Sequence, residues 1–311
     1  MRKRSALFGA VVLVAAIPLV LAPSCTITFV TPEIVTSTDT DNVTLPAGAT
    51  VVVSNELGTT NVSVDDVATQ ATVQVVRVAY AGTQEDAEDL LAEMEVTITE
   101  PTVGDNRLVI TAKAVEGATS NSGSFNMVVN ENDVAITSIL TRARVAKYRI
   151  TVTLPPGHGV EVTQKVGLIK AADLDTASTL DGAAASVAVE GCVADLTVNA
   201  DAGNVEVSSH SGSLTATLSA GSALIDIMAL AADDAVNVAV DAGSIDIDLP
   251  VGVGADLDAS ASVGTVMFDE TDFTAATVTT DTLSHVVAAL NGGGADVNLQ
   301  TDVGSVVIGA R

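Results

Sequence analysis

The chain has 311 residues, which is enough for one large domain or two ordinary ones with a sizeable hydrophobic core. Its formal net charge is -26, so nucleic acid and bare anionic membrane are excluded as favoured partners, because their phosphate groups would be repelled. Hydrophobic residues make up 48% of the chain but aromatic residues only 2%. Such a valine-rich, glycine-punctuated composition favours strands and tight turns over helix bundles.

Residues 1–24 have the features of a signal peptide. A basic start is followed by an apolar run from Ala6 to Ala22, broken by Pro18, and by small residues before Cys25. This pattern predicts export with cleavage. The alternative is an uncleaved anchor, but 17 residues fall short of the roughly 20 that a spanning helix needs.

Cleavage before Cys25 would resemble bacterial lipoprotein processing, in which the new N-terminal cysteine receives a lipid. We therefore predict Cys25 as a lipidation site and as the only attachment to a membrane. Leu21 lies one place too early for the usual motif, and Ala22 and Ser24 equally suit an ordinary signal peptidase. A disulfide between Cys25 and Cys192 is the alternative. With Cys25 lipidated, Cys192 is expected to be a small buried residue.

Residues 25–48 are rich in Thr and Asp and predict a solvated tether. Residues 49–150 predict a β-rich part, with strands at about 50–54 and 61–64 separated by the sequence NELGTT, then strands in ATVQVVRVAY and NRLVITAK. Between these, TQEDAEDLLAEMEV predicts a short amphipathic helix that packs on a sheet, with Thr83 as its N-cap.

Residues 151–311 carry a glycine motif and are expected to be continuous with the preceding part. The glycines are separated by 36, 40, 21 and 40 residues, close to multiples of twenty, and weaker copies lie near 187, 221 and 287. The glycines are Gly167, Gly203, Gly243, Gly264 and Gly304. A fixed period of this size predicts one coil of a solenoid per repeat.

The motif itself predicts a corner followed by a half-buried strand. Glycine adopts positive φ at little cost, which suits a corner. After Gly243 the side chains alternate, so Ile245, Ile247 and Leu249 are expected to point inward, with Val205 and Val207 as equivalents. Asp246 and Asp248 would then point outward. We predict a mainly β fold, a β-solenoid similar to a right-handed parallel β-helix with one short helix; the alternative is an open β-sandwich.

From about residue 49 to 308, the chain resembles a bacterial family of inferred adhesins, related to autotransporter adhesin heads. The resemblance rests on VVVSNELGTTNVSV, QEDAEDLLAEME, YRITVTLPPG and the repeats AGNVEV, AGSIDI and VGSVVI. It implies a β-solenoid in a cell-envelope protein with a structural or adhesion-like binding role, and it supplies no catalytic residues. The function predicted is that of an exported, lipid-anchored, non-enzymatic envelope protein that binds an unidentified envelope or surface component.

The sequence shows no pattern for a catalytic, cofactor or metal site. His158, His210 and His285 are isolated, and His210 is expected to be exposed in a turn; zinc spacing is missing. Residues 171–310 contain 21 Asp and Glu and no Lys or Arg. Pairs such as Asp256 and Asp258 would share an outward face, predicting a solvated acidic surface.

Two other uses of these aspartates remain open. A carbohydrate-active β-helix enzyme is the alternative function, and it would need a groove with three or more convergent carboxylates and a basic group. Weak binding of a divalent cation is also open, because calcium prefers oxygen ligands, although DLDTASTLDG lacks two required positions of a calcium loop.

Overall fold

A computed structural model describes residues 29–116, 118, 125–129, 133–140 and 142–311. The predicted signal peptide and Cys25 lie outside these ranges. The described chain is mainly β with one α-helix, which confirms the predicted class. That helix is too short to cross a membrane.

The elements, in chain order, are β1 (Phe29–Val30), β2 (Glu33–Val43), β3 (Thr50–Val64), β4 (Ala71–Ala81), α1 (Gln84–Glu93), β5 (Val96–Thr99), β6 (Arg107–Ala112), β7 (Phe125–Val129), β8 (Val134–Leu140), β9 (Val145–Leu154), β10 (Gly159–Ala172), β11 (Ser178–Glu190), β12 (Leu196–Ala202), β13 (Val205–Ser211), β14 (Leu214–Ala220), β15 (Ala223–Ala229), β16 (Ala235–Leu249), β17 (Ala255–Phe268), a 3₁₀ turn (Glu270–Asp272), β18 (Ala276–Thr282), β19 (His285–Leu290) and β20 (Ala295–Ala310).

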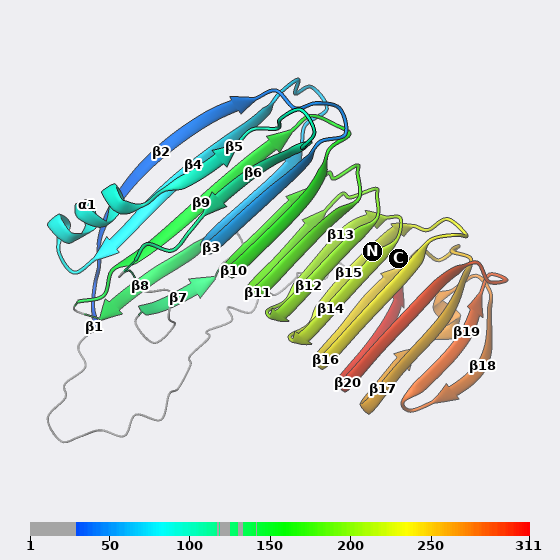
Figure 1. Cartoon of the computed structure of the whole chain (residues 1–311). Helices are drawn as coiled ribbons and strands as arrows, with labels where there is room; N and C mark the ends of the chain where they lie inside the picture. Colours follow the sequence, from blue (N-terminus) through cyan, green and yellow to red (C-terminus); the bar gives the residue numbers. More distant parts are fainter. Residues whose placement is uncertain (1–28, 117, 119–124, 130–132, 141) are drawn as a thin grey trace, which may run out of the picture.

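Long bent strands are stacked in parallel through the centre of the molecule (Figure 1). Each bends near its middle, so that it has a first leg before the bend and a second leg after it. In the next layer of the stack after β11, the two legs are separate strands: β12 pairs with the first leg of β11 and β13 with its second leg. Val160, Ser178, Leu196 and Leu214 are successive neighbours in the stack, 18 residues apart. This spacing agrees with the period of about twenty in the sequence.

Glycines form a column at the bend. Gly243 has φ 150° and Gly264 has φ 149°, which confirms the predicted positive φ. A Cβ on Gly243 would overlap the carbonyl oxygen of Gly221, and one on Gly304 would overlap that of Gly243. The bends are therefore stacked backbone on backbone, and glycine is needed for close approach as well as for its φ. In β11 the equivalent position is Ala185.

The core lies between the two legs and repeats from strand to strand. Ile245, Ile247 and Leu249 are fully buried, whereas Asp246 and Asp248 on the same leg are partly exposed. Val205 and Val207 are buried at the equivalent positions. The predicted alternation is confirmed, and it produces one continuous apolar core because each strand covers the next.

Both ends of the stack depart from chain order. β20 lies between β16 and β17, and β3 lies between β9 and β10. β19 pairs antiparallel with β17 and β18, so the weak glycine-motif copy near 287 does not form a stacked coil and that assignment is wrong. The described part of the chain is therefore not a simple solenoid in which every coil touches only its neighbours in sequence.

β3 is one continuous strand over Thr50–Val64, so the predicted separation into two strands at NELGTT is wrong. Gly58, with φ 136°, is the bend of this strand. The polar residues around it are buried on the inside of the bend: the side-chain amide of Asn55 donates to Thr60 Oγ1 at 3.2 Å, and Thr60 donates to Gln164 Oε1 at 2.7 Å. These hydrogen bonds satisfy the polar groups that are buried at the bend.

The segment expected to be a free tether contains β2. This strand pairs antiparallel with β4 along its whole length, so residues 33–43 are not a linker. Most side chains of β2 are exposed, because it is an edge strand, and this explains its tether-like composition.

The predicted helix is present as α1 and packs against β2 and β4 (Figure 1). Thr83 Oγ1 accepts a hydrogen bond from the backbone amide of Asp86 at 3.2 Å, which confirms the N-cap. Ala87 and Leu90 are buried on the inner face. Arg144, which precedes β9, bonds Glu93 at 2.8 Å and holds the end of the helix.

A separate three-stranded sheet of β1, β8 and β7 lies beside the bend of β3 and β9. The buried ammonium of Lys147 is 2.9 Å from Asp133 Oδ2, and Arg149 binds the same carboxylate. Burial lowers the pKa of Lys147 although Asp133 opposes the shift. This ion-paired cluster fixes the small sheet to the stack.

Candidate functional site

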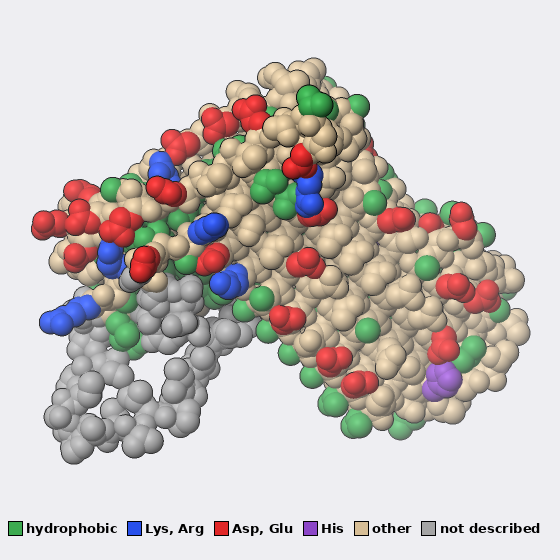
Figure 2. Space-filling view, viewed as in Figure 1, with side chains coloured by type: hydrophobic (Ala, Val, Ile, Leu, Met, Phe, Trp, Pro, Cys, Tyr) green, Lys and Arg blue, Asp and Glu red, His purple; other side chains and the backbone are tan. Residues whose placement is uncertain are grey.

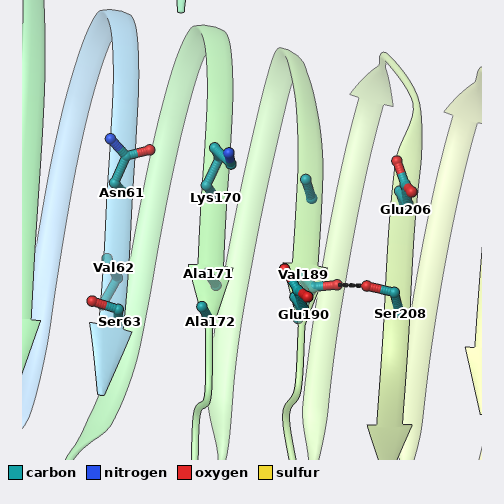
Figure 3. A pocket seen from close by; sticks show the side chains of 11 residues that line it. Asn61, Val62, Ser63, Lys170, Ala171, Ala172, Val189, Glu190, Glu206 and Ser208 are labelled. Carbon is teal, nitrogen blue, oxygen red and sulfur yellow. Dashed lines mark hydrogen bonds between the residues drawn. The ribbon is translucent and has the colours of Figure 1, made fainter. Parts of the chain in front are cut away.

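A shallow groove of about 460 Å³ crosses the outer face of the second legs of β3, β10, β11 and β13 (Figure 3). Its side chains form two rows that run across the strands. One row is Asn61, Lys170, Ala188 and Glu206. The other row is Ser63, Ala172, Glu190 and Ser208.

The groove is hollow because small residues lie between longer ones. Ala188 is the direct neighbour of Lys170 on one side and of Glu206 on the other. Its methyl group leaves open the space between a cationic and an anionic side chain. The strands are about 4.8 Å apart, so this space is fixed by backbone hydrogen bonds and does not depend on loops.

The groove joins opposite charges in an otherwise acidic region. Lys170 is the last basic residue before Arg311. In the described part of the chain it has no ion-pair partner, although two carboxylates, those of Glu190 and Glu206, line the same groove. Figure 2 shows the same asymmetry: basic side chains lie over the N-terminal part, while acidic ones are scattered over the stack formed by later strands. Ser208 donates a hydrogen bond to the Val189 carbonyl at 3.1 Å.

The three histidines are not brought together. His158 Nδ1 is 3.2 Å from the Ala49 carbonyl oxygen, and His285 Nε2 is 2.9 Å from Asp258 Oδ1. His210 is fully buried, so its predicted exposure in a turn is wrong. The cause is a bulge: Ser209 has φ 55°, and the register shifts after Val207. This extra residue turns the His210 side chain from the outer face into the core.

His210 is expected to make the fold sensitive to acid. Burial lowers its pKa, and its Nδ1 has no hydrogen-bond partner among the described residues. The unfolded chain then binds the proton more tightly, with a pKa of about 6.5, so the free energy of unfolding should decrease as pH falls below that value. Denaturant unfolding between pH 8 and pH 5 measures this. The variant His210→Gln should lose less stability over the range than wild type; an equal loss in both would contradict the assignment.

In the described ranges, the outward aspartates do not gather into a group that could hold a metal ion. Asp256 and Asp258 are exposed on the first leg of β17, as predicted. Asp226 and Asp248 are neighbours in register, and Arg311 binds Asp226. Among the described residues no group of three or more His, Cys, Asp and Glu could hold a metal ion. The groove contains two carboxylates, one fewer than the alternative enzyme requires.

The acidic surface should make stability depend on salt. The repeats repel one another at low ionic strength, and the Debye length shrinks from roughly 30 Å at 0.01 M to about 10 Å at 0.1 M. We expect the melting temperature to rise over this range. Because the carboxylates are dispersed, sodium and calcium chloride at matched ionic strength should raise it equally. A larger rise in calcium would reveal a cation site, and no rise in either would show that the surface charges do not interact.

Cys192 is a free thiol in the core. Its side chain is buried, and burial raises the pKa of the thiol to about 11. At neutral pH it is therefore protonated and unreactive. The partner that the sequence allows for a disulfide, Cys25, lies outside the described residues.

The groove residues were not identified from sequence. Asn61, Lys170, Glu190 and Glu206 come from four strands, and their proximity depends on parallel register. One signal was present in the sequence: Lys170 is the final basic residue before a long acidic stretch. This marked a charge boundary but not a groove.

No family model matches the chain, and no curated protein matches it in sequence. Solved structures that resemble it include an inferred cell adhesion protein of Clostridium sporogenes, with 14% identity, a TM-score of 0.34, and coverage of 90% of this chain and 100% of that one. An inferred adhesin of Bacteroides fragilis has 13% identity and a TM-score of 0.37, with coverage of 88% and 97%. One of Parabacteroides distasonis has 10% identity and a TM-score of 0.32, with coverage of 88% and 96%. These identities are too low to assign the chain to the family that its motifs resemble.

Proposed function

We propose that this chain is an exported cell-envelope protein with a non-enzymatic, adhesion-like binding role. The observation that carries the proposal is the groove of Lys170, Glu190 and Glu206 on a platform of stacked strands. Groups that bind a ligand are held most firmly on regular elements, and here each group stands on a separate hydrogen-bonded strand. Two carboxylates beside a lysine can hold a polar ligand in one orientation.

The platform is best described as a short β-solenoid over residues 159–249. Steps of 18 and 22 residues along the register, together with the glycine column, support this description. β3 and β20 then extend the stack at its two ends as inserted strands. Stacked parallel strands expose a wide face to a partner while their core remains closed.

Attachment to the envelope is proposed to occur through a lipid on Cys25. Cys192 is only 1% exposed, so a disulfide with Cys25 would require the N-terminal segment to enter the core. The intact mass of the N-terminal peptide from the purified protein tests this, with Cys25→Ser as the control that should lack the mass of the lipid. An unmodified Cys25, or one bonded to Cys192, would refute the anchor.

Binding by the groove can be tested separately from anchoring. Three full-length proteins are incubated with isolated envelopes, and all of them carry Cys25→Ser. The first has no other substitution, and the second also carries Ala188→Leu, which fills the groove without changing its charge. The third protein is the control and carries Thr179→Leu, which lies on the outer face of the first leg of β11, the strand that also bears Ala188. We expect Ala188→Leu to reduce the bound fraction at least several-fold and Thr179→Leu to leave it unchanged. Equal binding by all three proteins would remove the groove as the binding site.

A further inference from the structure

We propose that the groove binds a zwitterionic ligand of the peptide class, with its carboxylate at Lys170 and its ammonium group at Glu190 and Glu206. This inference rests on the proposed binding function and specifies its ligand. The side chains concerned come from β10, β11 and β13 and face the same hollow (Figure 3).

The charges of the groove and its surroundings favour a ligand that carries both a positive and a negative group. Residues 171–310 provide 21 acidic side chains and no Lys or Arg, so a purely anionic ligand is repelled by the surrounding field. A purely cationic ligand would be attracted by many aspartates elsewhere and would meet Lys170 in this groove. A ligand that carries both charges gains at both ends here, and it can do so in only one orientation.

The dimensions favour a short extended peptide. Lys170 is separated from Glu206 by the strand that bears Ala188, so their backbones are about 9.5 Å apart at two strand spacings. An extended peptide spans about 3.3–3.6 Å per residue, so two or three residues bridge this interval. Ala188 leaves room for the peptide backbone between the two charged side chains.

The uncharged lining suits amide groups. Ser63 and Ser208 contribute hydroxyl groups, and neither they nor Asn61 adds charge. The buried Oδ1 of Asn61 has no hydrogen-bond partner in the described part of the chain. Buried polar atoms are usually paired, so Asn61 carries an unmet hydrogen-bond acceptor among the groove residues.

The test is a titration of the full chain with trialanine, followed by NMR or calorimetry. The comparison peptides are N-acetyl-trialanine, which lacks the ammonium group, and trialanine amide, which lacks the carboxylate. We expect trialanine to bind and each blocked peptide to bind at least 10-fold more weakly. Lys170→Gln should weaken binding of trialanine at least 10-fold. Lys165→Gln, which removes an exposed lysine paired with Glu56 outside the groove, should leave binding unchanged.

Three results would overturn the inference: no binding of trialanine, equal binding of the blocked peptides, or equal losses in Lys170→Gln and Lys165→Gln. The binding function is judged independently by Ala188→Leu on envelopes. If that variant loses envelope binding while trialanine does not bind, the groove is functional and only the ligand class is wrong. If Ala188→Leu also binds envelopes normally, both proposals fail.

Discussion

Valine in place of Gly243 is expected to destabilise the protein by more than about 3 kcal/mol, because two costs act together. The backbone of Gly243 has φ 150°, which residues with a side chain rarely adopt. The Cβ of valine at this position would also overlap the carbonyl oxygen of Gly221. The obstacle is backbone in a hydrogen-bonded strand, so it cannot rotate away as a flexible side chain could. Typical domains are stable by only about 5–15 kcal/mol, so the loss would be a large fraction of the total.

Thermal and urea unfolding, followed by circular dichroism, measure this effect. Gly264→Val should behave similarly, because its Cβ would overlap the carbonyl oxygen of Gly304. Gly252→Ala is the matched control: nothing lies within 4 Å of the added Cβ, and we expect a change below about 1 kcal/mol. Comparable melting of Gly243→Val and the control would show that the glycine column is not closely stacked.

Aspartate in place of Ile247 is expected to cost about 4 kcal/mol or more, since it buries a carboxylate without a partner and removes core packing. Ile247 is fully buried and lies between Ile225 and Ile308 in register. The carboxylate would therefore face apolar side chains from both neighbouring strands. The melting temperature and the yield of folded protein report the loss.

Leu224→Asp provides the control for charge, because Leu224 is on the adjacent strand but its side chain is 42% exposed. The same kind of substitution there adds a solvated carboxylate between Glu206 and Asp246 in register, and we expect the added repulsion to cost about 1 kcal/mol or less. Should Ile247→Asp melt like wild type, the inward orientation of this leg would be incorrect.

Local features of the sequence were sufficient for much of the stack. Alternation placed Ile245, Ile247 and Leu249 in the core because successive side chains in a strand point to opposite faces. The recurrent glycines predicted the bends, since few other residues tolerate positive φ. The cap at Thr83 and the apolar spacing of Ala87 and Leu90 were likewise sufficient for α1.

Burial of polar groups could not be inferred in the same way. Asn55 and Thr60 have the composition of a turn, but the tertiary structure buries them because groups inside the bend of β3 need hydrogen-bond partners. His210 was misplaced because a single bulge reverses the alternation, and the bulge depends on the pairing of β13 with β15. The identity of the residue did not reveal either environment.

By itself, the sequence determined the β class, the bends, the inward side chains and the acidic outer surface, because each depends on a residue and its near neighbours. Only the tertiary structure decided that β20 inserts beside β16, that β3 inserts beside β10, and that Lys170 faces Glu206 across Ala188. The physical reason is that any strand edge with free backbone groups can accept a parallel partner. The choice among edges follows from the packing of the whole core, and the groove exists only once that choice has been made.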